Sequence, residues 1–427
     1  MKEPSVRAEI PIYYEDDVVP SLINYCQSQG MERFFLVADQ NTRAVLGKRV
    51  EERLRSGGID VKTILLTGQE IAPDEHFIMQ VLVQAGREER GYLAVGSGTI
   101  TDIVRFASHR TKTFFLSLPT APSVDGYTSG GAPLVIGGLK QTIQAEPPLA
   151  IFADLPTLCA APRPMVAAGF GDMLGKFTAL ADWKLGHLLW DEPYSGEIAK
   201  RVWDALQNCV DAVGEIGTAS AEGVRRLLDG LAESGLCMLD FGASPPASGS
   251  EHYISHYWEM KLLQEHRPAI LHGAKVGVGC LMVSRLYERI RELTRDEAMA
   301  RLRSTPMPDR ERDLQFIRVA YGPIADKVIA EQAPFLDMSG AAHSRLQQKI
   351  MDHWADVQEI AASVAPPQRL AAWLSEVGGP VNTRALGLGD EEAATAVECS
   401  HFYKNRFTVM KLSRMLGFEP FAKYALP

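Results

Sequence analysis

The chain has no two cysteines close enough in sequence to suggest a metal ribbon or a disulfide framework. Its six cysteines are scattered along the chain, at Cys26, Cys159, Cys209, Cys237, Cys280 and Cys399. Zinc ribbons and small disulfide-rich secreted modules need closely spaced cysteines. Both classes are therefore excluded, and we predict reduced, mostly structural thiols.

Long apolar runs and an excess of positive charge are also missing. No uninterrupted apolar stretch reaches the roughly 20 residues that a membrane helix needs, and Met1-Lys2-Glu3-Pro4 does not begin an apolar signal core. The net charge is -9, so nucleic acid and anionic membranes would repel the chain on average. We expect a cytoplasmic protein without a nucleic-acid or membrane partner. A small anionic substrate stays possible, because a pocket needs only local positive charge.

The pattern of apolar residues up to about residue 160 is typical of an α/β layer. Short runs rich in β-branched and aromatic residues alternate there with helical periodicity. The predicted strands are residues 34–38, 61–66, 92–95, 113–118 and 150–153, and a hairpin is predicted for residues 134–136 and 141–143 around Gly137-Gly138.

Beyond Pro162 and Pro164 the apolar spacing is helical throughout. Helices are predicted for residues 166–189, 196–213, 221–231, 251–264 and 274–293. Because 427 residues exceed what one hydrophobic core usually supports, we predict two domains. Residues 1–160 form a Rossmann-like α/β nucleotide-binding domain, and residues 161–427 form an all-helical domain for metal and substrate with a C-terminal helical extension.

A glycine-containing turn follows the predicted strand at 92–95. Gly96-Ser97-Gly98 leads into apolar positions with helical spacing, so backbone N–H groups and the positive end of a helix would face one point. This arrangement suits the diphosphate of a dinucleotide, although the third glycine of the usual G-x-G-x-x-G pattern is absent. A tight structural turn is the alternative interpretation.

Two side chains after the predicted strand at 34–38 bear on the same nucleotide. Asp39 could accept hydrogen bonds from an adenosine ribose, and its alternative role is a helix N-cap. Arg43 could accommodate a 2′-phosphate, which leaves NAD and NADP both open. Asp39 precedes the glycines, whereas the acid of the usual fingerprint follows them by about 20 residues. We therefore expect a different sheet arrangement.

The loop after the predicted strand at 113–118 is stiff and polar. It runs Pro119-Thr120-Ala121-Pro122-Ser123-Val124-Asp125-Gly126. Thr120 and Ser123 could contact a cofactor while Asp125 reaches a substrate hydroxyl. An ordinary proline-stabilised connection is the alternative.

Two histidines one helical turn apart point to a metal or substrate site. Ser248 and Glu251 have the spacing of a capping box, which predicts a helix that starts just before His252. A helix N-terminus keeps an imidazole neutral, the form that binds metal. His256 lies one turn later on the same face. Either both histidines bind the metal, or one binds it while the other faces the substrate.

Two further residues could complete a set of metal ligands. His272 lies between an apolar run and small residues, and Asp172 follows Gly169-Phe170-Gly171 at the head of a predicted helical stretch. Asp172 could be an N-cap or a ligand there. A carboxylate and imidazoles supply oxygen and nitrogen donors to one divalent ion. These motifs together favour a metal-assisted dehydrogenase.

The combined motifs resemble the sn-glycerol-1-phosphate dehydrogenases, in particular the bacterial type. That family lies within the superfamily of iron-containing alcohol dehydrogenases, glycerol dehydrogenases and dehydroquinate synthases. The resemblance covers most of residues 30–300 and rests on residues 96–102, 119–126, 169–172, 250–256 and 271–273. The tail beyond about residue 300 carries fewer recognisable motifs.

The resemblance implies roles for individual residues. Asp172, His252 and His272 would bind the metal, and Asp125, Asp172 and His256 would act on the substrate as the catalytic set. Cofactor contacts would come from Asp39, Gly98, Thr99, Ile100, Thr101, Asp102, Thr120, Ala121, Pro122, Ser123 and Ser129. The implied metal is nickel or zinc, with iron in more distant relatives, and the implied assembly is a homodimer.

The implied reaction is the reversible reduction of dihydroxyacetone phosphate to sn-glycerol 1-phosphate by NAD(H) or NADP(H), with the metal polarising the C2 carbonyl for hydride transfer. His256 would orient a hydroxyl or relay a proton. Lys176 is a candidate for the substrate phosphate, and a solvated helix lysine is the alternative. The alternative functions are a polyol dehydrogenase acting on glycerol, a lyase resembling dehydroquinate synthase, and a nucleotide-binding protein without turnover.

Overall fold

The computed structural model describes residues 9–68, 70–137 and 139–426. Two sequence features used above, the N-terminal residues Met1 to Pro4 and Gly138 of the predicted hairpin, lie outside these residues. The chain forms two compact units. Unit 1 comprises Met1–Met173 and Gln207–Ala243, and unit 2 comprises Leu174–Leu206 and Ser244–Pro427. The predicted domain boundary near residue 160 stays a prediction.

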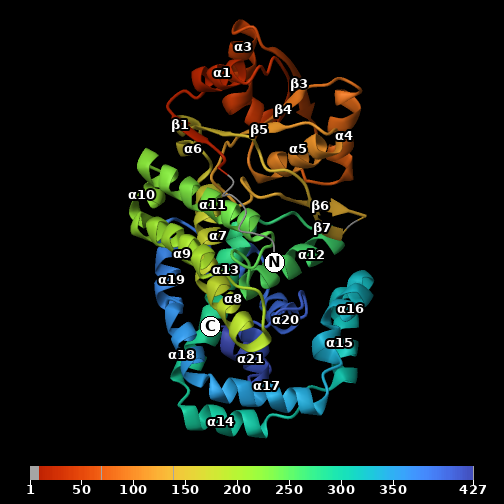
Figure 1. The fold of residues 1–427 in the computed structure, drawn as a ribbon, viewed down its shortest axis with the longest axis vertical. Coiled ribbons are helices and arrows are strands. Elements are labelled where there is room, and N and C mark those ends of the chain that lie inside the picture. Colours follow the sequence, from red (N-terminus) through yellow and green to blue (C-terminus); the bar gives the residue numbers. More distant parts are fainter. Residues whose placement is uncertain (1–8, 69, 138, 427) are drawn as a thin grey trace. The chain divides into compact units, whose positions relative to one another are not determined.

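Unit 1 is built on a parallel sheet of six strands in the order β1-β8-β5-β4-β2-β3. Figure 1 labels β1, β5, β4 and β3 of this sheet. These strands are β1 (Ile12–Glu15), β2 (Arg33–Asp39), β3 (Asp60–Leu66), β4 (Gly91–Val95), β5 (Phe115–Leu118) and β8 (Ile151–Asp154). A separate antiparallel hairpin joins β6 (Gly131–Ile136) to β7 (Leu139–Gln144). The chain leaves β2 for β3 on one side and returns to β4 on the other, so the order of strands reverses between β2 and β4. In open α/β sheets this is where ligands bind.

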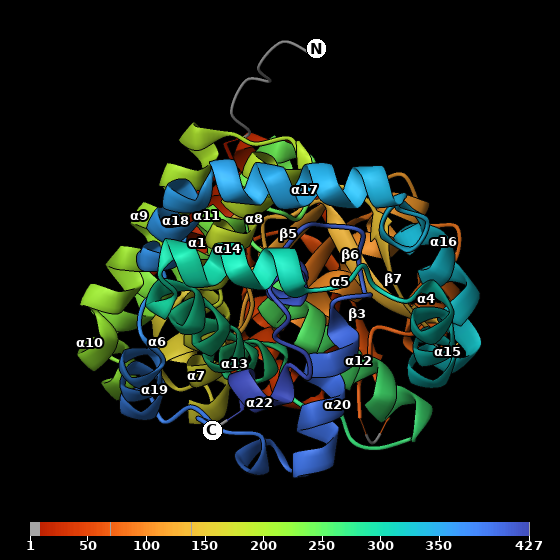
Figure 2. The same ribbon diagram turned by 90° about the horizontal axis from the view of Figure 1, so that it is seen from below.

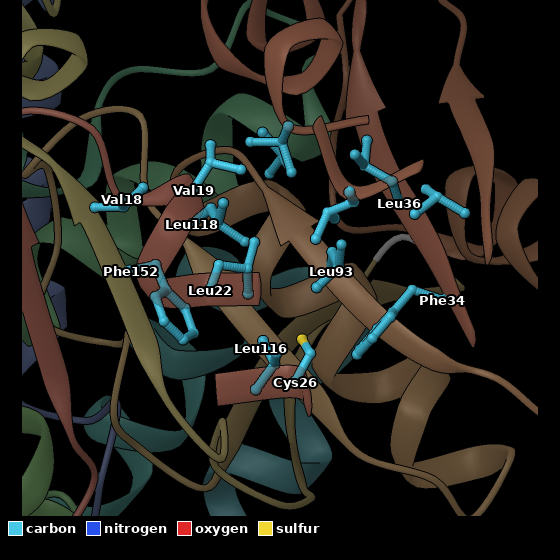
Figure 3. Packing of buried hydrophobic residues seen from close by; sticks show 14 of the residues in the cluster. Val18, Val19, Leu22, Cys26, Phe34, Leu36, Leu93, Leu116, Leu118 and Phe152 are labelled. Carbon is cyan, nitrogen blue, oxygen red and sulfur yellow. The ribbon is translucent and has the colours of Figure 1, made fainter. Parts of the chain in front are cut away.

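Helices cover both faces of this sheet because successive strand residues point in opposite directions. Phe34 and Leu36 of β2 pack in one cluster with Val19, Leu22 and Cys26 of α1 (Figure 3). The intervening residues of β2 pack in a second cluster with α4 and α5. The helices of unit 1 are α1 (Val19–Ser28), α2 (Gln40–Thr42), α3 (Lys48–Ser56), α4 (Glu75–Ala85), α5 (Gly98–Arg110), α6 (Leu155–Cys159), α7 (Arg163–Leu174), α10 (Val213–Thr218) and α11 (Ala221–Phe241), with a π-helical turn at Arg43–Gly47.

The mixed α/β fold with a helical C-terminal part is confirmed, and all five predicted strands and the hairpin are present. One strand, β1, was missed. It is an edge strand in which all four residues are only partly buried, so its sequence, Ile-Tyr-Tyr-Glu, lacks a continuous apolar run.

Unit 2 consists of helices and connecting segments, without a strand among its described residues. Figure 2 shows two of its helices, α14 and α17, running side by side. The helices are α8 (Lys176–Trp190), α12 (Ser250–Gln264), α13 (His272–Glu292), α14 (Arg295–Ser304), α15 (Arg310–Tyr321), α16 (Ala325–Leu336), α17 (Gly340–Asp352), α18 (Trp354–Ser363), α19 (Pro367–Glu376), α20 (Asp390–Ser400), α21 (Val409–Met415) and α22 (Ala422–Ala425), with short 3-10 turns at Gly322–Ile324 and Arg384–Leu386. The division between the units falls within α9 (Gly196–Asp211).

The predicted helix at 166–189 is two helices, because the chain breaks at Gly175 between α7 and α8. In the described part of the chain, no helix combines the length and apolar character needed to cross a membrane. The six cysteines are free thiols, as predicted. Burial raises the pKa of Cys26, Cys209 and Cys399 to about 12, which keeps these thiols protonated and unreactive.

Candidate functional site

An open cleft of about 340 Å³ lies in unit 1 where the strand order reverses. Its lining residues are Asp39, Gln40, Asn41, Thr42, Leu66, Gly68, Ile71, Ser97, Thr99 and Ile100. Three of the predicted cofactor residues, Asp39, Thr99 and Ile100, are among them. The residues come from the carboxyl ends of β2, β3 and β4, which is the edge at which parallel sheets bind nucleotides.

Asp39 is the N-cap of α2, so the capping alternative is confirmed. Its Oδ1 accepts a hydrogen bond from the Thr42 amide at 2.8 Å, and the Thr42 hydroxyl accepts one from the Asp39 amide at 3.0 Å. Contact with a ribose stays a prediction. Arg43, the alternative partner for a 2′-phosphate, donates to the Glu51 carboxylate at 3.0 Å.

The Gly96-Ser97-Gly98 turn joins β4 to α5, which begins at Gly98. Ser97 is the N-cap, but its side chain makes no capping hydrogen bond. No side chain therefore covers the first N–H groups of α5 as a cap would. A Cβ atom added to Gly98 would lie 2.9 Å from Val124 Cγ2, so glycine is needed there for close packing against the next loop. This geometry suits a diphosphate at the helix N-terminus.

The loop that contains Thr120–Ser123 lies directly beside this turn. The Gly96 amide donates to the Leu118 carbonyl at 3.1 Å, and the Thr120 amide donates to the Gly96 carbonyl at 3.3 Å. Thr120, Ala121 and Ser123 are buried. They are not among the lining residues of the cleft. Their contact with a cofactor stays a prediction.

Arg105 is a buried cation that the sequence patterns did not single out. Its guanidinium donates to the Asp102 carboxylate at 2.7 Å, to the Gly131 carbonyl at 2.9 Å and to the Tyr127 carbonyl at 3.1 Å. A further bond of 2.5 Å reaches the Gly126 carbonyl. Arg105 thereby holds the segment that carries Ser129. Burial raises the pKa of Asp102 to about 7, although Arg105 and Lys140 act to lower it.

Asp125 and Asp172, predicted to act on the substrate, lie together in unit 1. The Asp125 amide donates to Asp172 Oδ2 at 3.1 Å, and the Ser234 hydroxyl of α11 donates to Asp125 Oδ2 at 2.9 Å. The prediction that Asp172 heads a helix is wrong, because it lies in the last turn of α7. It is therefore no N-cap, and its side chain is fully buried.

The three predicted histidines cluster in unit 2. His252 and His256 lie on α12, and His272 is the first residue of α13. The ring centroids are 6.0 Å apart for His252 and His256, 5.3 Å for His252 and His272, and 5.6 Å for His256 and His272. A four-residue step on α12 and the start of α13 thus bring three imidazoles to one place.

Glu251 organises the start of α12, in a way that differs from the predicted capping box. The N-cap is Gly249 rather than Ser248, and no side chain caps the helix. Glu251 Oε1 accepts from the Gly249 amide at 2.7 Å and lies 2.7 Å from His252 Nδ1, while Oε2 accepts from the Thr178 hydroxyl at 2.6 Å. Burial raises the pKa of Glu251, but these hydrogen bonds outweigh it and leave the pKa lowered. Metal-binding histidines characteristically have such a carboxylate on the second ring nitrogen.

His256 lies in a more polar part of the cluster. Its Nδ1 is 3.5 Å from Glu259 Oε2, and Lys275 Nζ is 3.7 Å from the same oxygen. His256, Glu259 and His272 each offer a ligand atom within 4.8 Å of the others. The ring of Tyr403 stacks on that of His256, with centroids 5.2 Å apart and an interplanar angle of 26°.

Sequence reasoning missed the segment after α20 that contains Tyr403. Arg406 of this segment donates to the Ser248 carbonyl at 2.7 Å and to Glu192 at 2.9 Å. Lys404 donates to the Ser244 hydroxyl at 3.3 Å. No local pattern could have revealed these contacts, because the partners are separated by about 150 residues or more.

Comparison with known proteins first defines the class. The family described as iron-containing alcohol dehydrogenase matches residues 13–162. A glycerol dehydrogenase structure from Schizosaccharomyces pombe superposes with a TM-score of 0.61 at 16% identity, covering 98% of this chain and 91% of its own. At that identity the likeness shows the fold alone. The fold and this match point to the same class, the iron-containing alcohol dehydrogenases.

Closer relatives narrow the assignment. A glycerol-1-phosphate dehydrogenase (NAD(P)+) from Geobacillus stearothermophilus is 36% identical, with 91% of this chain and 88% of the relative covered. One from Halalkalibacterium halodurans is 38% identical over the same shares. The chain belongs to the glycerol-1-phosphate dehydrogenase family. Membership implies a nicotinamide nucleotide and a divalent metal.

Proposed function

We propose that this chain catalyses the reversible reduction of dihydroxyacetone phosphate to sn-glycerol 1-phosphate with NAD(P)H. The observation that carries the proposal is the similarity to glycerol-1-phosphate dehydrogenases over 91% of the chain. The cleft at the strand reversal and the histidine cluster support it.

Asp172, His252 and His272 are the proposed metal ligands. The family resemblance supports this set, which offers one carboxylate and two imidazoles, and such borderline donors suit nickel or zinc. The Glu251 carboxylate at His252 Nδ1 fits this role, because it fixes the proton on Nδ1 and places the lone pair on Nε2. A divalent ion held there would supply electrophilic polarisation of the substrate ketone.

The cofactor is proposed to lie along the cleft of unit 1. The diphosphate would meet the N-terminus of α5 at Gly98 to Asp102, the ribose would meet Asp39, and Thr120 to Ser123 and Ser129 would line the inner side. NAD(P)H supplies a hydride when bound. Arg43, which could bind the 2′-phosphate of NADP, is paired with Glu51. Its position therefore does not decide between NAD and NADP.

The remaining chemistry falls to side chains that handle hydroxyl groups and a proton. Reduction adds a hydride to C2 and a proton to its oxygen. We assign His256 to orient a substrate hydroxyl or to pass that proton, since Glu259 and Tyr403 position its ring. Asp125, held by Ser234, would accept a hydrogen bond from a second hydroxyl. A homodimer and a cytoplasmic location stay predictions.

The decisive experiment measures NAD(P)H oxidation with dihydroxyacetone phosphate by metal-depleted protein after addition of zinc, nickel or iron. Chelation should abolish turnover and one ion should restore it. His252→Ala and His272→Ala should lose both bound metal and turnover, whereas His256→Ala should keep the metal and lose turnover. His76→Ala, at an exposed position of α4, is the matched control. If the protein turned over glycerol but neither dihydroxyacetone phosphate nor sn-glycerol 1-phosphate, the result would instead support a polyol dehydrogenase.

A further inference from the structure

The segment between α20 and α21 reaches the histidine cluster within unit 2. Tyr403 stacks on His256, and its ring centroid is 6.0 Å from that of Tyr253 on the same helix. The next residue, Lys404, extends to Ser244, which lies in the segment that leads into α12. The Lys404 ammonium therefore lies beside the segment that leads into α12, the helix that bears His252 and His256.

Three other cations near this helix are bound to acceptors of the protein itself. Arg406 pairs with Glu192 at 2.9 Å, and Lys275 lies 3.7 Å from Glu259. Lys176, the phosphate candidate from sequence, is fully buried and donates to the Ala247 carbonyl at 3.1 Å. The solvated alternative for Lys176 is thereby wrong, and its ammonium is already engaged.

Lys404 differs from these cations in its partner. Its ammonium donates to the neutral hydroxyl of Ser244, and no described carboxylate lies within ion-pair distance of it. Burial lowers the pKa of Lys404 to about 8, and the positive charge of the nearby Arg406 contributes less in the same direction. The negative charge of Glu331 acts to raise this pKa. A half-buried cation without a carboxylate partner is stabilised when an anionic ligand arrives.

We propose that Lys404 and Ser244 form the subsite that binds the phosphate group of the substrate. The lysine supplies charge, and the serine hydroxyl, which accepts from Lys404, can donate its own proton to a phosphate oxygen. The inference rests on the proposed function and adds the residues that distinguish a phosphorylated triose from an uncharged one.

The test compares kcat/KM for dihydroxyacetone phosphate with kcat/KM for dihydroxyacetone, which lacks the phosphate. Lys404→Met should lower the ratio of the two by about 10- to 100-fold, the effect expected for one charge-assisted hydrogen bond. Lys404→Arg should restore much of the ratio, and Ser244→Ala should lower it by a smaller factor. Lys200→Met, an exposed lysine of α9, should leave the ratio unchanged.

Inorganic phosphate provides an independent probe, because it should compete with dihydroxyacetone phosphate. Its inhibition constant should rise in Lys404→Met and in Ser244→Ala. If the Met variant does not fold, the Ser244→Ala and Lys404→Arg values decide. An unchanged ratio and an unchanged inhibition constant in the folded variants would overturn the subsite. Failure of the unmodified protein to reduce dihydroxyacetone phosphate would instead overturn the proposed function.

Discussion

Glu251 Oε1 lies 2.7 Å from Nδ1 of His252, the next residue in the chain, and the same oxygen accepts a hydrogen bond from the Gly249 amide. The helix start and the imidazole are thus oriented by one buried carboxylate. The sequence suggested only a capping role for Glu251, so its contact with the histidine changes which variants are informative.

Glu251→Gln should weaken metal binding without removing a proposed ligand. The side-chain carbonyl of glutamine can still accept from the Gly249 N–H, but it carries no charge to polarise the imidazole. Loss of such a carboxylate partner typically lowers metal affinity about 10- to 100-fold. Competition with a coloured chelator would measure the affinity for zinc and nickel. Glu292→Gln, at an exposed glutamate of α13, is the control. Equal affinities in the two variants would contradict the role of Glu251.

Arg105→Lys should destabilise unit 1 although the charge is kept. A lysine ammonium cannot donate to Asp102 and to three backbone carbonyls in the fixed geometry of a guanidinium, so buried acceptors lose their partners. We expect the free energy of unfolding to fall by about 2 kcal/mol or more. Urea unfolding of the variant beside Arg110→Lys, an exposed change on the same helix, would check this. Unaltered stability would show that the clamp is dispensable.

Gly169→Ala should strain the contact between α7 and the loop after β5. A Cβ atom at position 169 would lie 1.9 Å from the Pro122 carbonyl oxygen, so backbone must move. Overpacking of this kind costs about 1–3 kcal/mol, and displacement of Pro122 should raise KM for the nucleotide. Gly196→Ala, where the added atom meets nothing within 4 Å, should be neutral by both denaturation and kinetics.

Asp102 should make stability depend on pH in the acidic range. Its folded pKa of about 7 exceeds the ordinary value of 3.8, chiefly through burial. Between these values the native state holds a proton that the unfolded chain has released, so this contribution favours folding at low pH and fades as the pH rises through 7. Urea unfolding at several pH values should show a smaller decline in Asp102→Asn than in the unmodified protein. Parallel profiles for both proteins would refute the assignment.

The strands of the sheet could be predicted because each central strand is buried on both faces and reads as a continuous apolar run. The edge strand β1 lacks that signal, since its residues are only partly buried. Gly175 separates α7 from α8, although the helical spacing of apolar residues continues on both sides of it. Periodicity alone therefore predicts one helix where there are two. The positions of elements followed from local pattern, whereas their ends did not.

The residues expected at the candidate site could be named only because several short motifs occur together. Glu251 stood within a quoted motif, yet its bond to His252 depends on the rotamer that Thr178 and Gly249 select. Arg105 and Lys404 were missed for another reason. Their partners are distant in sequence, and no periodic pattern encodes a contact between a side chain and a remote loop.

The interrupted course of unit 1 has a consequence for how the protein matures. Residues 207–243 return to this unit only after residues 174–206 have entered the other one. They bring α11, whose Ala232 carbonyl accepts from Thr128 and whose Ser234 donates to Asp125. A nascent chain on the ribosome therefore cannot complete unit 1 until α11 has emerged. A fragment that ends at residue 173 would lack the Ser234 hydroxyl that holds Asp125.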